Sequence, residues 1–222
     1  MLAQFVLFDG FDPLDVIAPF EVFSAAGLFS GQVACELVSA EGPREVPSAL
    51  AAISLTATAR LDPDRADLVV VPGAAGRTQP PDEDDPNADR PETVPDILGR
   101  ALGTDLPGLL GKALAAPGTT VATVCGGSLV LSMAGLIEGR RATTHHQGLD
   151  VLGMGGVEVI RARVVDDGDL VTGGGVTSGL DLGLHLVERE VGPRIAHAVE
   201  TLFEHERRGV AWRDHGPAPK TV

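Results

Sequence analysis

The segment Val121-Ala-Thr-Val-Cys125-Gly-Gly-Ser128 most constrains the fold, because its apolar run stops at a cysteine and two glycines before another apolar run begins. This order predicts a strand, a sharp turn and a helix, with the thiol of Cys125 exposed at the turn. Gly126 and Gly127 lack a Cβ and let the chain turn tightly. The N–H groups and the dipole of the following helix favour a thiolate. We therefore predict a reactive Cys125, against the alternative of a small buried residue that ends a core strand.

Strands and helices alternate along most of the chain. Asp12 and Pro13 are typical of a helix start, and Gly27 is expected to end that helix. The predicted strands are 4–8, 34–39, 68–71, 119–124, 141–145 and a hairpin of 163–165 with 170–172. The predicted helices are 13–26, 106–115, 128–136, 177–190 and 193–204. Repeated strand and helix units indicate an α/β fold with a mostly parallel sheet, helices on both faces, and ligands beyond the carboxyl ends of the strands.

Charge and cysteine content restrict the class of function. The 222 residues suit one α/β domain, and the net charge of -14 argues against a nucleic-acid partner, because phosphate binding needs clustered lysine and arginine. Cys35 and Cys125 lie far apart in apolar segments, which fits a reducing compartment better than a disulfide framework. The first cationic side chain is Arg44, and no apolar run approaches membrane-spanning length. We therefore expect a cytoplasmic protein with no membrane partner.

One proline-rich acidic segment, at about 77–96, has almost no apolar surface to bury. We interpret it as a solvated insertion in a single domain that spans residues 1–208, with a lid over the site as the alternative. Residues 209–222 are expected to form a flexible tail.

Several polar groups are predicted at the same edge of the sheet as Cys125. Asp15 falls in the first turn of the first helix, where the helix N-terminus stabilises a carboxylate. The alternative to a catalytic role is that Asp15 only stabilises the start of the helix through this dipole effect. The backbone N–H groups of Gly73, Ala74 and Gly126 are candidates for an anion hole, although glycine turns in α/β folds are often only turns.

His145 and His146 are adjacent at the end of a predicted strand, so at most one of them is expected to face the sulfur. His145 is the candidate for substrate contact, and a hydrogen-bonded structural histidine is the alternative. No CxxC or HxxxH pattern accompanies the pair, so no metal site is predicted. Gly173-Gly-Gly175 has neither the lysine of a phosphate loop nor the spacing of a dinucleotide fingerprint, so no cofactor is expected.

Five blocks of sequence together resemble the DJ-1/ThiJ/PfpI superfamily and, within it, the isonitrile hydratases. The blocks are Phe8-Asp-Gly-Phe-Asp-Pro-Leu-Asp15-Val-Ile-Ala-Pro-Phe-Glu-Val-Phe23, Val70-Val-Pro-Gly73, Val124-Cys125-Gly-Gly-Ser-Leu-Val-Leu131, Ala134-Gly-Leu-Ile-Glu-Gly-Arg-Arg-Ala-Thr-Thr-His145 and Leu170-Val-Thr-Gly-Gly-Gly-Val-Thr-Ser-Gly-Leu-Asp181. They extend over most of the chain apart from the acidic segment and the last residues. The first block is the one typical of the hydratase branch.

The resemblance implies a flavodoxin-like three-layer sandwich, a homodimer, and a catalytic pair with Cys125 as nucleophile and Asp15 as its hydrogen-bonded acid and base. It also implies a cofactor-free hydratase that converts a small isonitrile to an N-substituted formamide through a covalent intermediate. This sequence departs from the hydratases at Gly126, where they carry threonine, and at His146, where they carry tryptophan. The acidic segment is a third difference. These departures concern the substrate more than the nucleophile.

Three other functions stay open at this point. A glyoxalase or deglycase that acts on small dicarbonyls is one, but the glutamate expected near the cysteine is absent. Related domains also form the ligand-binding part of AraC-type regulators, which need a helix-turn-helix domain that the residues after the last predicted helix are too few to supply. The third is a redox sensor that acts through oxidation of Cys125. Of these functions we expect the hydratase.

Overall fold

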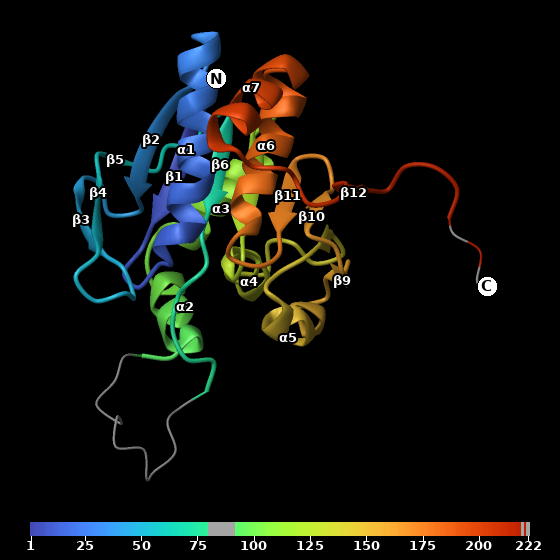
Figure 1. Ribbon diagram of the computed structural model, residues 1–222. Helices are drawn as coiled ribbons and strands as arrows, with labels where there is room; N and C mark the ends of the chain where they lie inside the picture. The colour runs from blue at the N-terminus through green and yellow to red at the C-terminus, as the bar shows by residue number, and fades with distance from the viewer. Residues whose placement is uncertain (80–91, 219, 221–222) are drawn as a thin grey trace.

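A mostly parallel sheet organises the protein. Within the residues that the computed structural model describes, 1–79, 92–218 and 220, the sheet has eight strands in the order β12-β10-β11-β7-β6-β1-β2-β5 (Figure 1). The strands are β1 (Leu2–Leu7), β2 (Ala34–Ser39), β5 (Ala59–Arg60), β6 (Leu68–Val71), β7 (Thr120–Val124), β10 (Val164–Asp166), β11 (Leu170–Gly173) and β12 (Trp212–Arg213). β10 pairs antiparallel with β11, and the other neighbours pair in parallel.

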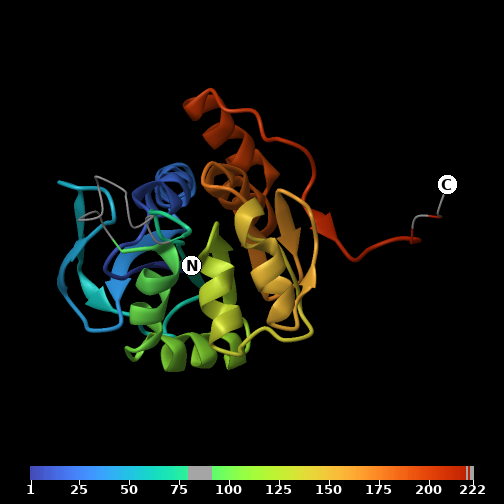
Figure 2. The same ribbon diagram turned by 90° about the horizontal axis from the view of Figure 1, so that it is seen from below.

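Helices cover both faces of this sheet (Figure 2). One face carries α1 (Pro13–Ser30), α6 (Ser178–Glu190) and α7 (Pro193–Phe203). The other face carries α3 (Leu106–Ala115) and α4 (Gly127–Met133), and α2 (Val94–Leu102) packs against both of these helices. A further helix, α5 (Leu149–Met154), lies with α2 beyond the carboxyl ends of the strands (Figure 1). The flavodoxin-like three-layer sandwich that was expected is confirmed.

Apolar side chains from the helices and the sheet form the core. β6 is buried along its whole length, as a central strand between two helical layers should be. Phe5 of β1 makes edge-to-face contacts with Phe20 and Phe23 of α1, with ring centroids 5.2 and 6.0 Å apart. Of the described helices, α1 is the one long and apolar enough to cross a membrane, and half of it is buried inside the protein. α1 packs as a core helix, which fixes its first turn next to the sheet.

The predicted end of α1 is wrong. The helix continues past Gly27 to Ser30, and Gly31, with a φ of 67°, is the residue that caps it. Gly27 instead lies where the returning chain crosses the helix closely. A Cβ on Gly27 would lie 2.6 Å from the carbonyl oxygen of Val33, so glycine is needed there for space and not for a turn.

The acidic segment predicted at 77–96 ends earlier than expected, because α2 begins at Val94. Thr93 and Asp96 form a capping box, in which each side chain accepts a hydrogen bond from the backbone N–H of the other residue. Residues 80–91, the centre of the predicted insertion, lie outside the described residues.

Several short elements have no counterpart in the prediction. They are α2, α5, β5, the hairpin of β3 (Arg44–Pro47) with β4 (Ser54–Ala57), and β9 (Glu158–Val159), which pairs in parallel with β8 (Arg141–Ala142). The strand predicted at 141–145 is therefore confined to its first two residues.

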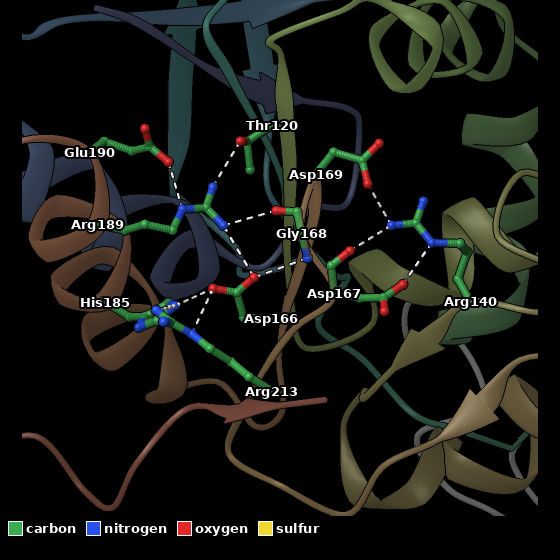
Figure 3. A network of polar contacts seen from close by, with 10 residues as sticks. All are labelled: Thr120, Arg140, Asp166, Asp167, Gly168, Asp169, His185, Arg189, Glu190 and Arg213. Carbon is green, nitrogen blue, oxygen red and sulfur yellow. Dashed lines mark hydrogen bonds and ion pairs between the residues drawn. The ribbon is translucent and has the colours of Figure 1, made fainter. Parts of the chain in front are cut away.

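Within the segment 209–222, where a flexible tail was predicted, Trp212 and Arg213 form a short strand of the sheet. β12 pairs with β10, and Arg213 Nε lies 3.2 Å from Asp166 Oδ2. Figure 3 shows that Asp166 is the centre of a polar network. His185 Nε2 of α6 lies 2.8 Å from its Oδ2, and Arg189 Nη1 donates to its Oδ1 at 3.2 Å. This network joins α6, the β10–β11 hairpin and the C-terminal strand.

Candidate active site

Cys125 occupies the turn directly after β7. Its φ of 55° lies in the left-handed region, which is uncommon for a residue with a side chain and typical of a nucleophile at a strand-to-helix turn. Its backbone N–H donates to the carbonyl oxygen of Gly173 at 3.0 Å, which keeps the turn aligned with β11. Cys125 is only 7% exposed, so it is more buried than predicted. The exposed part opens on a cavity.

Hydroxyl groups hold this turn in place. Thr144 Oγ1 donates to the carbonyl oxygen of Cys125 at 2.8 Å, and Ser128 Oγ donates to the carbonyl oxygen of Thr143 at 2.8 Å. These bonds fasten the segment after β8 to the turn. Sequence reasoning missed the role of Thr144, because the bond joins residues 19 positions apart. The one available signal was its position directly before His145.

The close approach of two turns also fixes the position of Cys125. A Cβ on Gly73, after β6, would lie 2.5 Å from the nitrogen of Gly126 and 2.9 Å from Asp15 Oδ2. A Cβ on Gly127 would lie 2.2 Å from the carbonyl oxygen of Val71. Only glycine fits at these two positions. A Cβ on Gly126 would meet its nearest neighbour at 3.5 Å, an ordinary contact, so position 126 has room for a larger residue.

Asp15 lies in the first turn of α1 and is fully buried. Its Oδ2 accepts a hydrogen bond from the N–H of Gly73 at 2.9 Å, and its Oδ1 has no partner among the described residues. Burial, together with the negative charge of Asp12, raises the pKa of Asp15 to about 8, although the bond from Gly73 acts in the opposite direction. The carboxyl of Asp15 is therefore protonated near neutral pH.

Burial and the charge of Asp15 raise the pKa of the Cys125 thiol, and the N–H of Gly126 offsets only part of this effect. Burial and the acidic neighbour thus oppose the predicted stabilisation of a thiolate by the backbone donors at the start of the helix. Cys125 and Asp15 are interacting groups that are both neutral near pH 7.

The predicted anion hole is only partly available. Gly73 donates its N–H to Asp15, so this donor is already used within the protein, and contact of Gly73 with a substrate anion stays a prediction. Ala74 and Gly126 line the cavity beside Cys125. Their backbone groups stay candidates for contact with substrate.

A cavity of about 400 Å³ opens at the carboxyl end of β7, with Cys125 in its wall. Most of the side chains that line it are apolar, and they include Val94, Leu98, Leu129, Met133, Val151 and Val176. Among the described lining residues Asp12 is the one carboxylate, and lysine and arginine are absent. In the described part of the chain no group of three or more His, Cys, Asp or Glu side chains is arranged to hold a metal ion. The cavity suits a small, uncharged and largely apolar ligand.

His145 lines this cavity but does not end a strand as predicted. It caps a short 3-10 helix, η1 (His146–Gly148), and its Nδ1 accepts a hydrogen bond from the N–H of Gln147 at 3.4 Å. Burial and the neighbouring His146 lower the pKa of His145, so its ring is neutral near pH 7 and carries its proton on Nε2. His146, which stands where the hydratases carry tryptophan, is exposed and is not among the described residues that line the cavity.

Together these features define a class of protein: a three-layer α/β fold with a cysteine at a strand-to-helix turn and a buried carboxyl beside the sulfur. The model of the DJ-1/PfpI family matches residues 108–189, which include β7, Cys125 and most of α6. The chain belongs to the DJ-1/PfpI family.

Three relatives and one solved structure are similar to this chain. Isonitrile hydratase from Pseudomonas putida is 45% identical over 94 residues, which are 42% of this chain and 41% of that protein. The uncharacterized protein in the cpoL 5' region of Streptomyces lividans is 37% identical over 142 residues, 64% of this chain and 85% of that protein. The HTH-type transcriptional regulator CdhR from Pseudomonas aeruginosa is 34% identical over 107 residues, 43% of this chain and 32% of that protein. A ThiJ/PfpI family protein from Pseudomonas syringae has a TM-score of 0.75 at 24% identity, and the match covers 94% of this chain and 76% of that chain. The matches thus cover less than half of the hydratase and of the regulator.

Proposed function

We propose that this protein is a cofactor-free, cysteine-dependent hydratase that converts an isonitrile to an N-substituted formamide. One observation carries the proposal: the thiol of Cys125 opens on an apolar cavity of about 400 Å³ and has the protonated carboxyl of Asp15 behind it. The terminal carbon of an isonitrile takes up both a proton and a nucleophile, so an acid beside a thiol suits this group. The 45% identity to an isonitrile hydratase supports the same chemistry.

In the first step Asp15 donates its proton to the terminal carbon while the sulfur of Cys125 attacks the same carbon. The thiol proton passes to Asp15 and restores its carboxyl. One C–H bond and one C–S bond form, and the product is a thioimidate in which the former isonitrile carbon joins nitrogen and sulfur. The N–H of Gly126 stabilises negative charge on the sulfur during this transfer.

In the second step water adds to the carbon of the thioimidate, and the C–S bond breaks. The electron pair of that bond returns to sulfur, which regains a proton, and the substrate nitrogen keeps one proton from the water. The product is the N-substituted formamide. Covalent catalysis thus divides one difficult hydration into two easier steps.

A panel of alkyl and aryl isonitriles, with formamide measured by mass spectrometry, tests this proposal. We expect Cys125→Ala to abolish formamide formation and Asp15→Asn to reduce it by at least about a hundredfold, because the acid is lost. Cys35→Ser is the matched control, since Cys35 lies in β2, away from the cavity, and this variant should keep full activity. The proposal fails if the wild-type protein converts none of the panel or if Cys125→Ala retains activity.

A ligand-sensing role is the second candidate, and the 34% identity to the regulator CdhR over 107 residues favours it. A sensor would bind a small apolar ligand in the same cavity without converting it. Isothermal titration calorimetry with the panel, combined with product analysis, separates the two functions. Saturable binding without any product supports the sensor and contradicts the hydratase.

A further inference from the structure

The cavity contains one carboxylate that the two steps above do not use. Asp12 lines the cavity together with Cys125, whereas Asp15 is fully buried and is not part of the described lining. Asp15 is therefore placed to act beside the sulfur, where it exchanges protons with the thiol and with the carbon that the sulfur attacks. A water molecule that enters the cavity to attack the thioimidate meets Asp12 instead.

Backbone contacts hold Asp12 in a defined position. Its Oδ1 caps α1 by accepting a hydrogen bond from the N–H of Leu14 at 2.9 Å. Its own N–H donates to the carbonyl oxygen of Gly73 at 3.0 Å, and the N–H of Gly73 donates to Asp15. Gly73 thus holds the backbone of Asp12 through its carbonyl oxygen and the carboxyl of Asp15 through its N–H, and the carboxyl of Asp12 is held separately by the N–H of Leu14. This arrangement keeps both next to the turn that carries Cys125.

The other polar side chains in the described lining do not supply a base. His145 uses Nδ1 as the acceptor for the N–H of Gln147 and carries its proton on Nε2, so the free side of the ring is a donor. The side chains of Thr78 and Gln147 have no basic group at neutral pH. Asp12 is the remaining lining group that can accept a proton from water.

On the basis of the proposed function, we propose that Asp12 is the catalytic base of the second step, and that Asp15 serves the first. Asp12 accepts a proton from the attacking water and passes it to the substrate nitrogen, while the water oxygen bonds to carbon. The C–S bond then breaks, and its electron pair goes to sulfur. The remaining hydroxyl proton leaves through Asp12 to the sulfur. One thioimidate and one water give one N-substituted formamide and the free thiol of Cys125.

Asp12→Asn tests this role directly, because asparagine keeps the capping oxygen of α1 but cannot accept a proton as a base. With an isonitrile that the wild-type protein converts, we expect the covalent adduct on Cys125 to form at the wild-type rate in the variant. We expect kcat to fall by at least about a hundredfold. The adduct, heavier than the free protein by one substrate mass, should accumulate in mass spectra. Asp12→Ser, which also keeps a capping oxygen, should behave in the same way.

Asp150→Asn is the matched control. Asp150 is an exposed acid in the first turn of α5, next to the lining residue Val151, so this variant removes the same charge near the cavity and should keep wild-type kcat. If the Asp12→Asn variant forms formamide at the wild-type rate and no adduct accumulates, the proposed role of Asp12 is wrong, but the hydratase proposal still holds. Loss of adduct formation in Asp12→Asn also overturns the role of Asp12, because the first step would then be the one affected. Wild-type protein that forms neither adduct nor formamide overturns the hydratase itself.

Discussion

Burial acts in the same direction on the two central residues of the site. It raises the pKa of the Asp15 carboxyl to about 8 and also raises the pKa of the Cys125 thiol, and the negative charge of Asp15 raises the thiol pKa further. Near neutral pH the site therefore presents an acid and an uncharged sulfur to the substrate. The sulfur becomes a strong nucleophile only when its proton is transferred during the reaction.

Alkylation of Cys125 tests this coupling independently of any substrate. At about pH 9 Asp15 is ionised in the wild-type protein, and its charge raises the pKa of the Cys125 thiol. The Asp15→Asn variant lacks this charge and should react faster with iodoacetamide, by about tenfold for each unit by which the thiol pKa falls. At about pH 6 Asp15 is protonated, so the two proteins should react at similar low rates. Mass spectrometry in a Cys35→Ser background reports on Cys125 alone. A slower reaction of Asp15→Asn at the higher pH contradicts the coupling.

At the scale of elements, the sequence predicts well those helices and strands that have a long apolar pattern with clear ends. β2, β6 and α3 have the predicted bounds, because turn-forming residues flank each apolar run. α2 was missed although its apolar residues share one face, because it follows the acidic segment directly. The β3–β4 hairpin was missed because its short strands bury few residues and give weak periodicity. The threonine and aspartate of the capping box before α2 are a signal that sequence reasoning could have used.

The sequence predicts those parts of the site that lie at the ends of strands. Cys125 and Asp15 each follow a strand, so their meeting at one edge of the sheet follows from the parallel topology. The bond between Gly73 and Asp15 joins residues 58 positions apart, and no local pattern contains it. Burial of the thiol likewise depends on how distant elements pack. For this reason the protonation of the pair could not be predicted from the sequence.

Two buried threonines near Cys125 offer a matched comparison. Thr144→Val removes the hydrogen bond to the carbonyl oxygen of Cys125 and should lower the free energy of unfolding by about 1–2 kcal/mol. Thr123→Val replaces a buried hydroxyl that has no partner in the described part of the chain, so stability should stay the same or rise. Urea unfolding of both variants measures the difference. Equal losses in the two variants would contradict the role given to Thr144.

At the scale of the whole molecule, the network around Asp166 joins parts of the chain that are far apart in sequence (Figure 3). Burial alone raises the pKa of Asp166, but hydrogen bonds from His185 and the N–H of Gly168 and the charge of Arg189 lower it to about 2. Because the folded-state pKa lies below the value in the unfolded chain, ionised Asp166 stabilises the fold. This stabilisation is complete above the unfolded-state pKa and is lost as the pH falls through about 2.

Asp166→Asn should therefore lower the free energy of unfolding at neutral pH by about 2–3 kcal/mol, from a pKa difference of about two units. The difference between wild type and variant should shrink as the pH falls from about 4 toward 2. Urea unfolding at a series of pH values measures both effects. Asp169→Asn, in which a half-exposed partner of Arg140 is changed, should cost less than about 1 kcal/mol. A loss that does not depend on pH would show that Asp166 acts through packing alone.

At position 125 the left-handed backbone conformation favours glycine for stability, whereas the proposed reaction requires cysteine. A glycine there would relax the backbone by about 1 kcal/mol or more, yet it would leave the cavity without its sulfur. Cys125 therefore cannot be replaced by glycine, the residue that would adopt this backbone conformation with the least strain. The surrounding hydrogen bonds hold the left-handed conformation, which the segment would not keep on its own.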